Sequence, residues 1–340
     1  MLEFNCAATI IGGMPDKDAA VACAGISKHL VDLPAWPQLP LRSNLENMYV
    51  QYSQGFPGIV VDGQKLHVDH GTNMDHGMEH LYYDWTENKS NGYVIDKEHA
   101  SGLHYLASHT SAALPVLKGQ ITGPISWGLC VTDDSGRGII YDETLADAVS
   151  RFLKLKASWL EHFMRSFSRK TVVFLDEPYL ASLGSAFVAL PNGQIKEHLS
   201  EVLSGIQGIK GIHCCGGTDW SLLLGLPIDV ISFDAYNYLD SILSYQQDLL
   251  NHLRSGHAIA WGIVPNDEET LKKETPAGLF DRFSDALSHL TRDGLSIRQV
   301  VRQSLVTPSC ALLSLTHDGV EYTYNLLTEL SSRARRKYGS

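Results

Sequence analysis

The chain has 340 residues, of which 44% are hydrophobic, and its 38 acidic and 27 basic side chains give a formal net charge of −11. This negative balance argues against a nucleic-acid partner, because phosphate binding depends on a clustered basic surface. The sequence contains no run of 18 apolar residues and no signal-peptide pattern, so we expect a cytoplasmic protein with no membrane partner.

Short apolar runs alternate with amphipathic stretches, a pattern typical of βαβ units around a parallel sheet. The predicted strands are residues 5–11, 114–121, 171–175, 208–213, 229–233, 258–264 and 304–307. Residues 58–62 and 65–69 flank Gly63 and are expected to form a hairpin or a further strand. The predicted helices are residues 142–167, 240–253, 277–290 and 320–336.

About eight strands, most of them followed by a helix, predict an α/β fold: a single (β/α)8 TIM barrel over residues 1–340. A doubly wound sheet fits less well, because no strand is followed by a Gly-rich phosphate fingerprint. Residues 31–58 and 70–95 are rich in Pro, Gly and polar residues and lack strong periodicity. We therefore expect two long loops there, at the C-terminal mouth of the barrel.

A His-x-Cys pair, His213 and Cys215, lies at the end of the predicted strand 208–213. In a TIM barrel the C-terminal strand ends carry the catalytic groups. The pair can offer an imidazole nitrogen and a thiolate to one metal ion. The alternative is a core histidine beside buried cysteines, since cysteine is often buried for packing alone.

Two further strand ends favour the metal. Asp234 follows the apolar run 229–233, and Cys310 follows the strand 304–307. With His213 and Cys215 they would offer nitrogen, oxygen and two sulfur atoms to one point, a donor set that selects zinc over calcium or magnesium. Cys214, between the two paired residues, should then point away from the metal.

The strand 171–175 ends in Asp176. A carboxylate there could cap a helix or pair with a substrate ammonium group. Gly12 and Gly13, after the first strand, allow the backbone to approach a ligand closely. Glu46 is a weaker candidate for the ammonium, and a solvated surface carboxylate is the alternative there.

Three motifs carry a family resemblance: T-I-I-G-G-M-P at residues 9–15, K-G-Q-I-T-G-P at 118–124 and L-D-E-P-Y-L at 175–180. Together with the His-x-Cys pair, they resemble the catalytic barrel of cobalamin-independent methionine synthase, within a group that includes uroporphyrinogen decarboxylase-like corrinoid methyltransferases. The resemblance covers nearly all of residues 4–338, in order. It implies zinc on His213, Cys215, Asp234 and Cys310, with Asp176, Gly12, Gly13 and Glu46 at the amino-acid substrate.

The sequence departs from this family at several positions. Asp234 stands where the family usually has glutamate, Gly13 replaces a serine, and Ala311 rather than glycine follows Cys310. Full-length methionine synthases also carry an N-terminal barrel associated with a folate donor. Since this chain shows no such half, the resemblance implies a methyl-corrinoid (methylcobalamin, free or on a corrinoid protein partner) rather than a folate as donor.

The implied reaction is methyl transfer to a thiol that zinc activates, with homocysteine as the first candidate acceptor. Asp234 would be the zinc ligand that the substrate displaces, and Asp176 would hold the substrate ammonium. The alternatives are a corrinoid methyltransferase acting on another thiol such as coenzyme M, a uroporphyrinogen decarboxylase-like enzyme, and a non-catalytic subunit that binds zinc or a corrinoid.

A separate group of histidines, His67, His70, His76 and His80, falls within 14 residues. It could bind a second metal or face a corrinoid, but its spacing matches no zinc signature. A polar loop at the mouth is the favoured interpretation.

Overall fold

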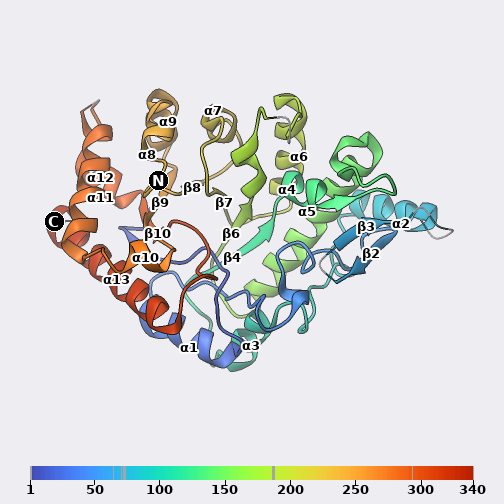
Figure 1. The fold of residues 1–340 in the computed structure, drawn as a ribbon, viewed down its shortest axis with the longest axis horizontal. Helices are drawn as coiled ribbons and strands as arrows, with labels where there is room; N and C mark the ends of the chain where they lie inside the picture. The colour runs from blue at the N-terminus through green and yellow to red at the C-terminus, as the bar shows by residue number, and fades with distance from the viewer. Residues whose placement is uncertain are drawn as a thin grey trace.

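Seven parallel strands form the central sheet of the computed structural model, which describes residues 2–63, 65–69, 71, 74–185, 188–292 and 294–339. In sheet order the strands are β1 (Ala7–Ala8), β10 (Ser304–Pro308), β9 (Ala258–Val264), β8 (Val230–Phe233), β7 (Ile209–Cys214), β6 (Thr171–Asp176) and β4 (Leu117–Thr122). All seven overlap the strands that the sequence predicts. The sheet is curled, with helices along its outer side (Figure 1).

The sequence predicts a barrel of about eight strands, whereas the central sheet has seven strands in the described residues and is not closed. The gap between β1 and β4 is occupied by residues 34–38, which form only isolated bridges to the two edges, Ala35 to Lys118 and Gly13 to Gln38. Their backbone bonds to both neighbours are short: Lys118 N donates to Pro34 O at 2.8 Å and Gln38 N to Gly12 O at 2.9 Å. The physical reason is the sequence P-A-W-P, since proline donates no backbone hydrogen bond to a ladder.

The helices that follow the strands cover the sheet as the sequence predicts, with one division. Residues 240–253 form two short helices, α8 and α9, in place of one. The helices are α1 (Ala19–His29), α3 (Ser101–His109), α4 (Pro124–Cys130), α5 (Glu143–Arg165), α6 (Asn192–Ser204), α7 (Trp220–Leu224), α8 (Leu239–Leu243), α9 (Gln246–Arg254), α10 (Glu268–Leu271), α11 (Pro276–Thr291), α12 (Ile297–Arg302) and α13 (His317–Tyr338). Three 3₁₀ helices add to these: η1 (Asn44–Glu46), η2 (Ile139–Tyr141) and η3 (Pro178–Ser182).

A small second sheet lies beyond α5 (Figure 1). It pairs β2 (Ile59–Asp62) with β3 (Lys65–Val68) as the predicted hairpin, and β3 with β5 (Val131–Thr132). The expected loop over residues 70–95 is wrong, because it contains the helix α2 (Met74–Thr86), which packs against α5. No helix in the described ranges is both long and apolar enough to cross a membrane.

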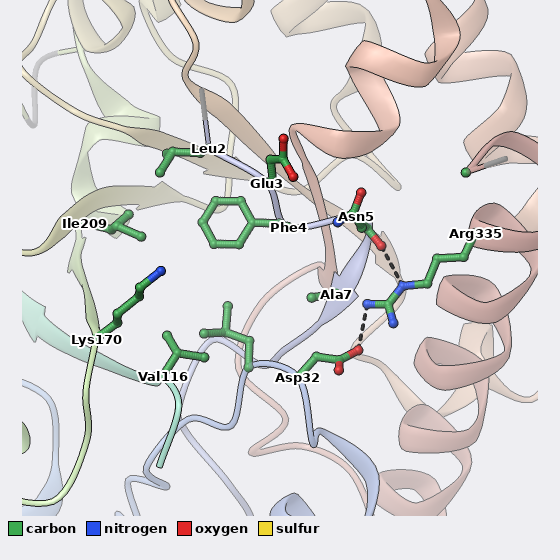
Figure 2. Close-up of a pocket in the computed structure, with 12 residues that line it drawn as sticks. Leu2, Glu3, Phe4, Asn5, Ala7, Asp32, Val116, Lys170, Ile209 and Arg335 are labelled. Atoms are coloured by element: carbon green, nitrogen blue, oxygen red, sulfur yellow. Dashed lines mark hydrogen bonds and ion pairs between the residues drawn. The ribbon is translucent and has the colours of Figure 1, made fainter. Parts of the chain in front are cut away.

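The two ends of the sheet differ. At the N-terminal ends of the strands lies an open cavity of about 810 Å³, with Phe4, Val116, Lys170 and Ile209 in its lining (Figure 2). At its rim Arg335, on α13, donates to the Asn5 carbonyl and pairs with an Asp32 carboxylate oxygen at 2.6 Å. The hydrogen bond to Asn5 ties the C-terminal helix to the beginning of the chain. The opposite end of the sheet carries the residues singled out by the sequence.

Candidate metal centre

Three metal-ligating side chains meet at the C-terminal ends of the strands. His213 is in β7, Cys215 is the first residue after β7, and Cys310 lies two residues after β10. Their ligand atoms all lie within 4.8 Å of one another, and no other group of this kind was found in the described part of the chain. Because β8 and β9 separate β7 from β10 in the sheet, it is the curl of the sheet that brings these residues together.

The orientation of the His213 ring is fixed by one hydrogen bond. Its Nδ1 lies 2.9 Å from the hydroxyl oxygen of Ser232, on the neighbouring strand β8. Its Nε2 is buried and has no hydrogen-bond partner among the described residues. An imidazole held through one nitrogen, with the other left bare beside two thiols, is the arrangement of a metal ligand.

A hydrogen bond joins the two thiols. The Cys310 thiol donates to the Cys215 sulfur, and this hydrogen bond, more than the nearby His213, lowers the pKa of Cys215. The same pairing raises the pKa of Cys310. One sulfur is thus prepared as a thiolate, the form that binds a metal. One imidazole and two cysteines fit zinc, and three protein ligands leave the fourth position open, as in catalytic rather than structural zinc sites.

Asp234, the predicted fourth ligand, is not part of this cluster. It follows β8, and its carboxylate accepts hydrogen bonds from the Asn237 backbone N at 2.9 Å and side-chain Nδ2 at 2.7 Å. Burial raises the pKa of Asp234, and the negative charge of Cys215 adds to this increase. Each carboxylate oxygen accepts one hydrogen bond from Asn237 and keeps a lone pair for a metal, so the role of Asp234 as a ligand stays a prediction.

A cavity of about 190 Å³ opens beside the cluster. It brings together most of the residues that the sequence analysis assigns to metal and substrate. Its lining consists of Ile11, Gly13, Gln38, Pro40, Glu46, Asn47, Met48, Tyr49, Asp176, Pro178, His213, Cys215, Cys310, Ala311 and Leu313.

Asp176 lines this site, and one of its carboxylate oxygens has no hydrogen-bond partner among the described residues. It ends β6, with its Cα paired in register to that of His213. Its Oδ1 is buried without a hydrogen-bond partner in the described ranges. Burial raises the pKa of Asp176 to about 6, while His213 and the buried Lys118 favour the charged form. The helix-capping alternative is not seen, since the 3₁₀ helix η3 begins after Glu177 and has no side-chain cap.

Glu46 also lines the cavity, but its carboxylate is already satisfied. It is fully buried, so the alternative of a solvated surface carboxylate is wrong. Its Oε1 accepts from Arg42 at 2.9 Å and Ser101 at 2.5 Å, and its Oε2 accepts from Leu39 N at 3.0 Å. This carboxylate joins the segment around η1 to α3.

The two glycines have different positions. Gly13 lines the cavity, and a Cβ there would lie 3.1 Å from the Cβ of Ala311. Gly12 is not among the lining residues. With φ +153°, it packs against Gln120, whose Cδ would be 2.5 Å from a Cβ at this position. Gly12 therefore serves the fold, through its carbonyl bond to residues 34–38, more than the ligand site.

Sequence reasoning missed two buried polar residues around the site. Ser232 orients His213, and a serine inside the apolar run 229–233 was the available signal. Lys118 is fully buried, with its Nζ 2.7 Å from Ile11 O and 3.3 Å from Gln120 Oε1. A lysine inside a predicted barrel strand could have been recognised as a buried cation. Cys214 behaves as expected, since its thiol is buried and donates to Gly216 O.

The histidine-rich segment does not form a second centre among the described residues. His67 is in β3, His76 and His80 are in α2, and His70 lies outside the described residues. No metal-binding group was found that includes the three described histidines. His80 lies instead 3.1 Å from Asp84, one turn further along the helix.

Comparison of the sequence with protein-family models and with curated proteins gives no match. Solved structures that match this chain include a B12-independent methionine synthase from Shewanella sp. W3-18-1 in complex with selenomethionine (18% identity, 70% of this chain, 66% of that chain, TM-score 0.48). A putative vitamin-B12 independent methionine synthase from Listeria monocytogenes also matches (13% identity, 95% of this chain, 86% of that chain, TM-score 0.56). A methyltransferase from Methanosarcina mazei is a third match (12% identity, 70% of this chain, 63% of that chain, TM-score 0.46).

The Listeria protein is the relevant comparison, because its TM-score is above 0.5 and the match covers most of both chains. At 13% identity, this similarity establishes a common fold and leaves the activity open. The chain spans 66% of the length of the Shewanella protein.

Proposed function

We propose that this protein is a zinc-dependent methyltransferase that activates the thiol group of a small molecule. The observation that carries the proposal is the bare His213 Nε2 beside the hydrogen-bonded thiols of Cys215 and Cys310, at the catalytic end of the sheet. The similarity in fold to a putative methionine synthase supports it.

His213, Cys215 and Cys310 would hold the metal, and Asp234 is proposed as the ligand that exchanges with substrate. A bound zinc ion would remove the proton of an acceptor thiol, which at its usual pKa near 8.5 is mostly protonated at neutral pH. Ser232 keeps the His213 ring in place. Asp176 would receive the ammonium group of the acceptor and so orient its sulfur. Homocysteine has both a thiol and an ammonium group and is the first candidate acceptor.

The size of the cavity bears on the donor. Its volume of about 190 Å³ is below the roughly 300–1,000 Å³ of pockets for drug-sized ligands, so it has room for a small acceptor alone. The methyl donor must then approach from outside the cavity. We propose a methyl-corrinoid, free or on a partner protein, as that donor. This part of the proposal rests on the sequence resemblance.

Cobalt in place of zinc tests the proposal, because a thiolate bound to cobalt gives a visible charge-transfer band. We expect the band to grow on titration with homocysteine and to be lost in Cys310→Ser. Cys214→Ser is the matched control, since Cys214 lies next to the cluster without belonging to it. Growth of the band with coenzyme M alone would select the alternative acceptor. A protein that binds no metal, or whose spectrum responds to no thiol, would refute thiol activation.

A further inference from the structure

The charges around the cavity are one-sided. Outside the metal cluster its acidic lining residues are Glu46 and Asp176, and neither lysine nor arginine is among the described lining residues. A ligand in this cavity therefore meets two carboxyl groups and no lysine or arginine side chain. This feature narrows the choice among thiols.

The two carboxylates are not equivalent toward a ligand. Glu46 accepts hydrogen bonds from Arg42, Ser101 and the Leu39 backbone, so its charge is already compensated. Asp176 keeps a bare Oδ1. Lys118 is buried near Asp176, but it does not line the cavity. Its ammonium group donates to the Ile11 carbonyl and to the side-chain oxygen of Gln120. Of the two carboxylates, Asp176 is thus the one with an oxygen that no hydrogen bond satisfies.

The rest of the lining offers a ligand carboxylate little compensation. Pro40, Met48, Pro178, Ala311 and Leu313 are apolar. The side-chain amide of Gln38 is engaged with Gln51 at 2.6 Å and Tyr52 at 3.2 Å, and the donors of Asn47 and Tyr49 are neutral. The free-energy cost of moving a carboxylate from water into such surroundings is largely uncompensated, because no cationic side chain replaces its hydration.

We propose that the cavity selects a cationic aminothiol whose carboxyl group is absent or masked as an amide or ester. This inference rests on the proposed function and narrows its substrate class. The ammonium pairs with Asp176 and the sulfur faces the metal cluster, while the remainder of the molecule meets apolar walls. Free homocysteine, whose carboxylate has no cationic partner here, is then a poorer ligand than its amide.

The test uses two matched pairs of ligands and calorimetric titration of the zinc-loaded protein, with the cobalt spectrum as a second readout. Cysteamine and 2-mercaptoethanol differ by the ammonium group, and homocysteine amide and homocysteine differ by the carboxylate. We expect the cationic member of the first pair and the amide of the second to bind at least about tenfold more tightly, a difference of roughly 1.4 kcal/mol. Homocysteine binding as tightly as its amide, or more tightly, would overturn this inference and leave the proposed function standing. A protein silent toward every thiol would refute both.

A substitution on the apolar wall makes the cause testable. Leu313 is 39% exposed, so a longer polar side chain can be accommodated there without loss of the core. Leu313→Arg supplies the missing cation, and we expect it to reduce the preference for homocysteine amide over homocysteine by about tenfold. Leu313→Gln, polar but neutral, should leave the preference as it is. Equal preferences in the two variants would show that the missing cation is not the cause and would overturn the inference.

Discussion

The hydrogen bond between His213 Nδ1 and Ser232 Oγ decides which ring nitrogen faces the two thiols. Partners of this kind fix the tautomer and the orientation of a metal-binding imidazole, and their loss weakens metal binding about 10–100-fold. We therefore expect Ser232→Ala to weaken zinc binding by that factor, measured by competition with a chromogenic chelator. Ser304→Ala is the control, because Ser304 is equally buried and bonds to Trp261 and Val300 instead. Equal losses in the two variants would contradict this role.

The clustering of the candidate ligands His213, Cys215 and Cys310 could be predicted because each stands at or just beyond the end of an apolar strand, where the fold class alone directs it to one end of the sheet. The state of Asp234 could not be predicted in the same way. Its carboxylate is held by Asn237, three residues further on, and strand patterns carry no information about such a local bond. Glu46 was uncertain for a different reason, since its carboxylate is hydrogen-bonded to Ser101, which is distant in sequence.

At the scale of elements, Glu161 of α5 connects the helix to the beginnings of two strands. Its Oε1 accepts from the Thr171 hydroxyl at 2.6 Å and from Gly208 N at 2.6 Å, and its Oε2 accepts from Gln207 N at 2.5 Å. Glu161→Gln would place an amide NH₂ against backbone donors. We expect a loss of about 2–4 kcal/mol in the free energy of unfolding, measured with guanidinium chloride.

The control for this prediction is Glu329→Gln, on the exposed face of α13. Glu329 is 40% exposed and pairs with Arg333 at 2.8 Å, and pairs of this kind contribute at most about 1 kcal/mol. A loss in Glu161→Gln no larger than in this variant would show that the three bonds to Glu161 do not hold α5 against the sheet.

His252, near the end of α9, predicts a pH dependence of stability. It is buried, and burial, with the neighbouring His257, lowers its pKa to about 4 from the ordinary 6.5. Between these two pH values the unfolded chain binds the proton and the folded protein does not. The contribution of neutral His252 to the free energy of unfolding is therefore complete above pH 6.5 and is lost as the pH falls to 4. The expected loss is on the order of 3 kcal/mol.

Guanidinium unfolding at pH 7.5, 6 and 5 checks this expectation. Other groups also titrate in this range, so the informative quantity is the difference between the protein and His252→Gln, whose amide can still donate to the Ala258 carbonyl. That difference should diminish as the pH falls. A difference that is constant across the three pH values would mean that His252 does not resist protonation in the fold.

Helix prediction succeeded where one helix buries a long apolar face and was wrong where tertiary contacts decide. α5 buries residues along its whole length, so its periodicity is visible in the sequence. α2 buries only Met74, Leu81 and Asp84, and its pattern therefore looks like that of a polar loop. Its Gly77 lies against Pro57, a contact that residue composition does not reveal.

At the scale of the whole molecule, residues 34–38 take the place of an eighth strand between β1 and β4. The side chains beneath this segment belong to one hydrogen-bonded group: Gln120 donates to Trp36 O at 3.3 Å, and Tyr52 donates to Gln120 O at 2.7 Å. Strand count and composition could predict that a sheet curls into a barrel-like shape. They could not show that a proline-interrupted segment would bridge its edges, because the bonds from Gln38 to Gly12 and from Lys118 to Pro34 join residues that are 26 and 84 positions apart.

Gly12 is where this bridging segment is most sensitive to substitution. Its carbonyl accepts from Gln38 N, and a Cβ there would lie 2.5 Å from Gln120 Cδ and 2.8 Å from Gln38 Oε1. Gly12→Ala must therefore displace the side chains that hold residues 34–38 in the gap, and we expect it to lower the free energy of unfolding by about 2–4 kcal/mol. Gly136→Ala separates backbone strain from this overlap, because Gly136 also has a positive φ, +81°, but nothing lies within 4 Å of its added Cβ. Strain alone should cost roughly 1–2 kcal/mol. The same denaturation experiment measures the free energy of unfolding of both variants. Equal losses would mean that Gly12 contributes conformational freedom alone, and that the contacts around Gln120 do not limit how residues 34–38 bridge the sheet.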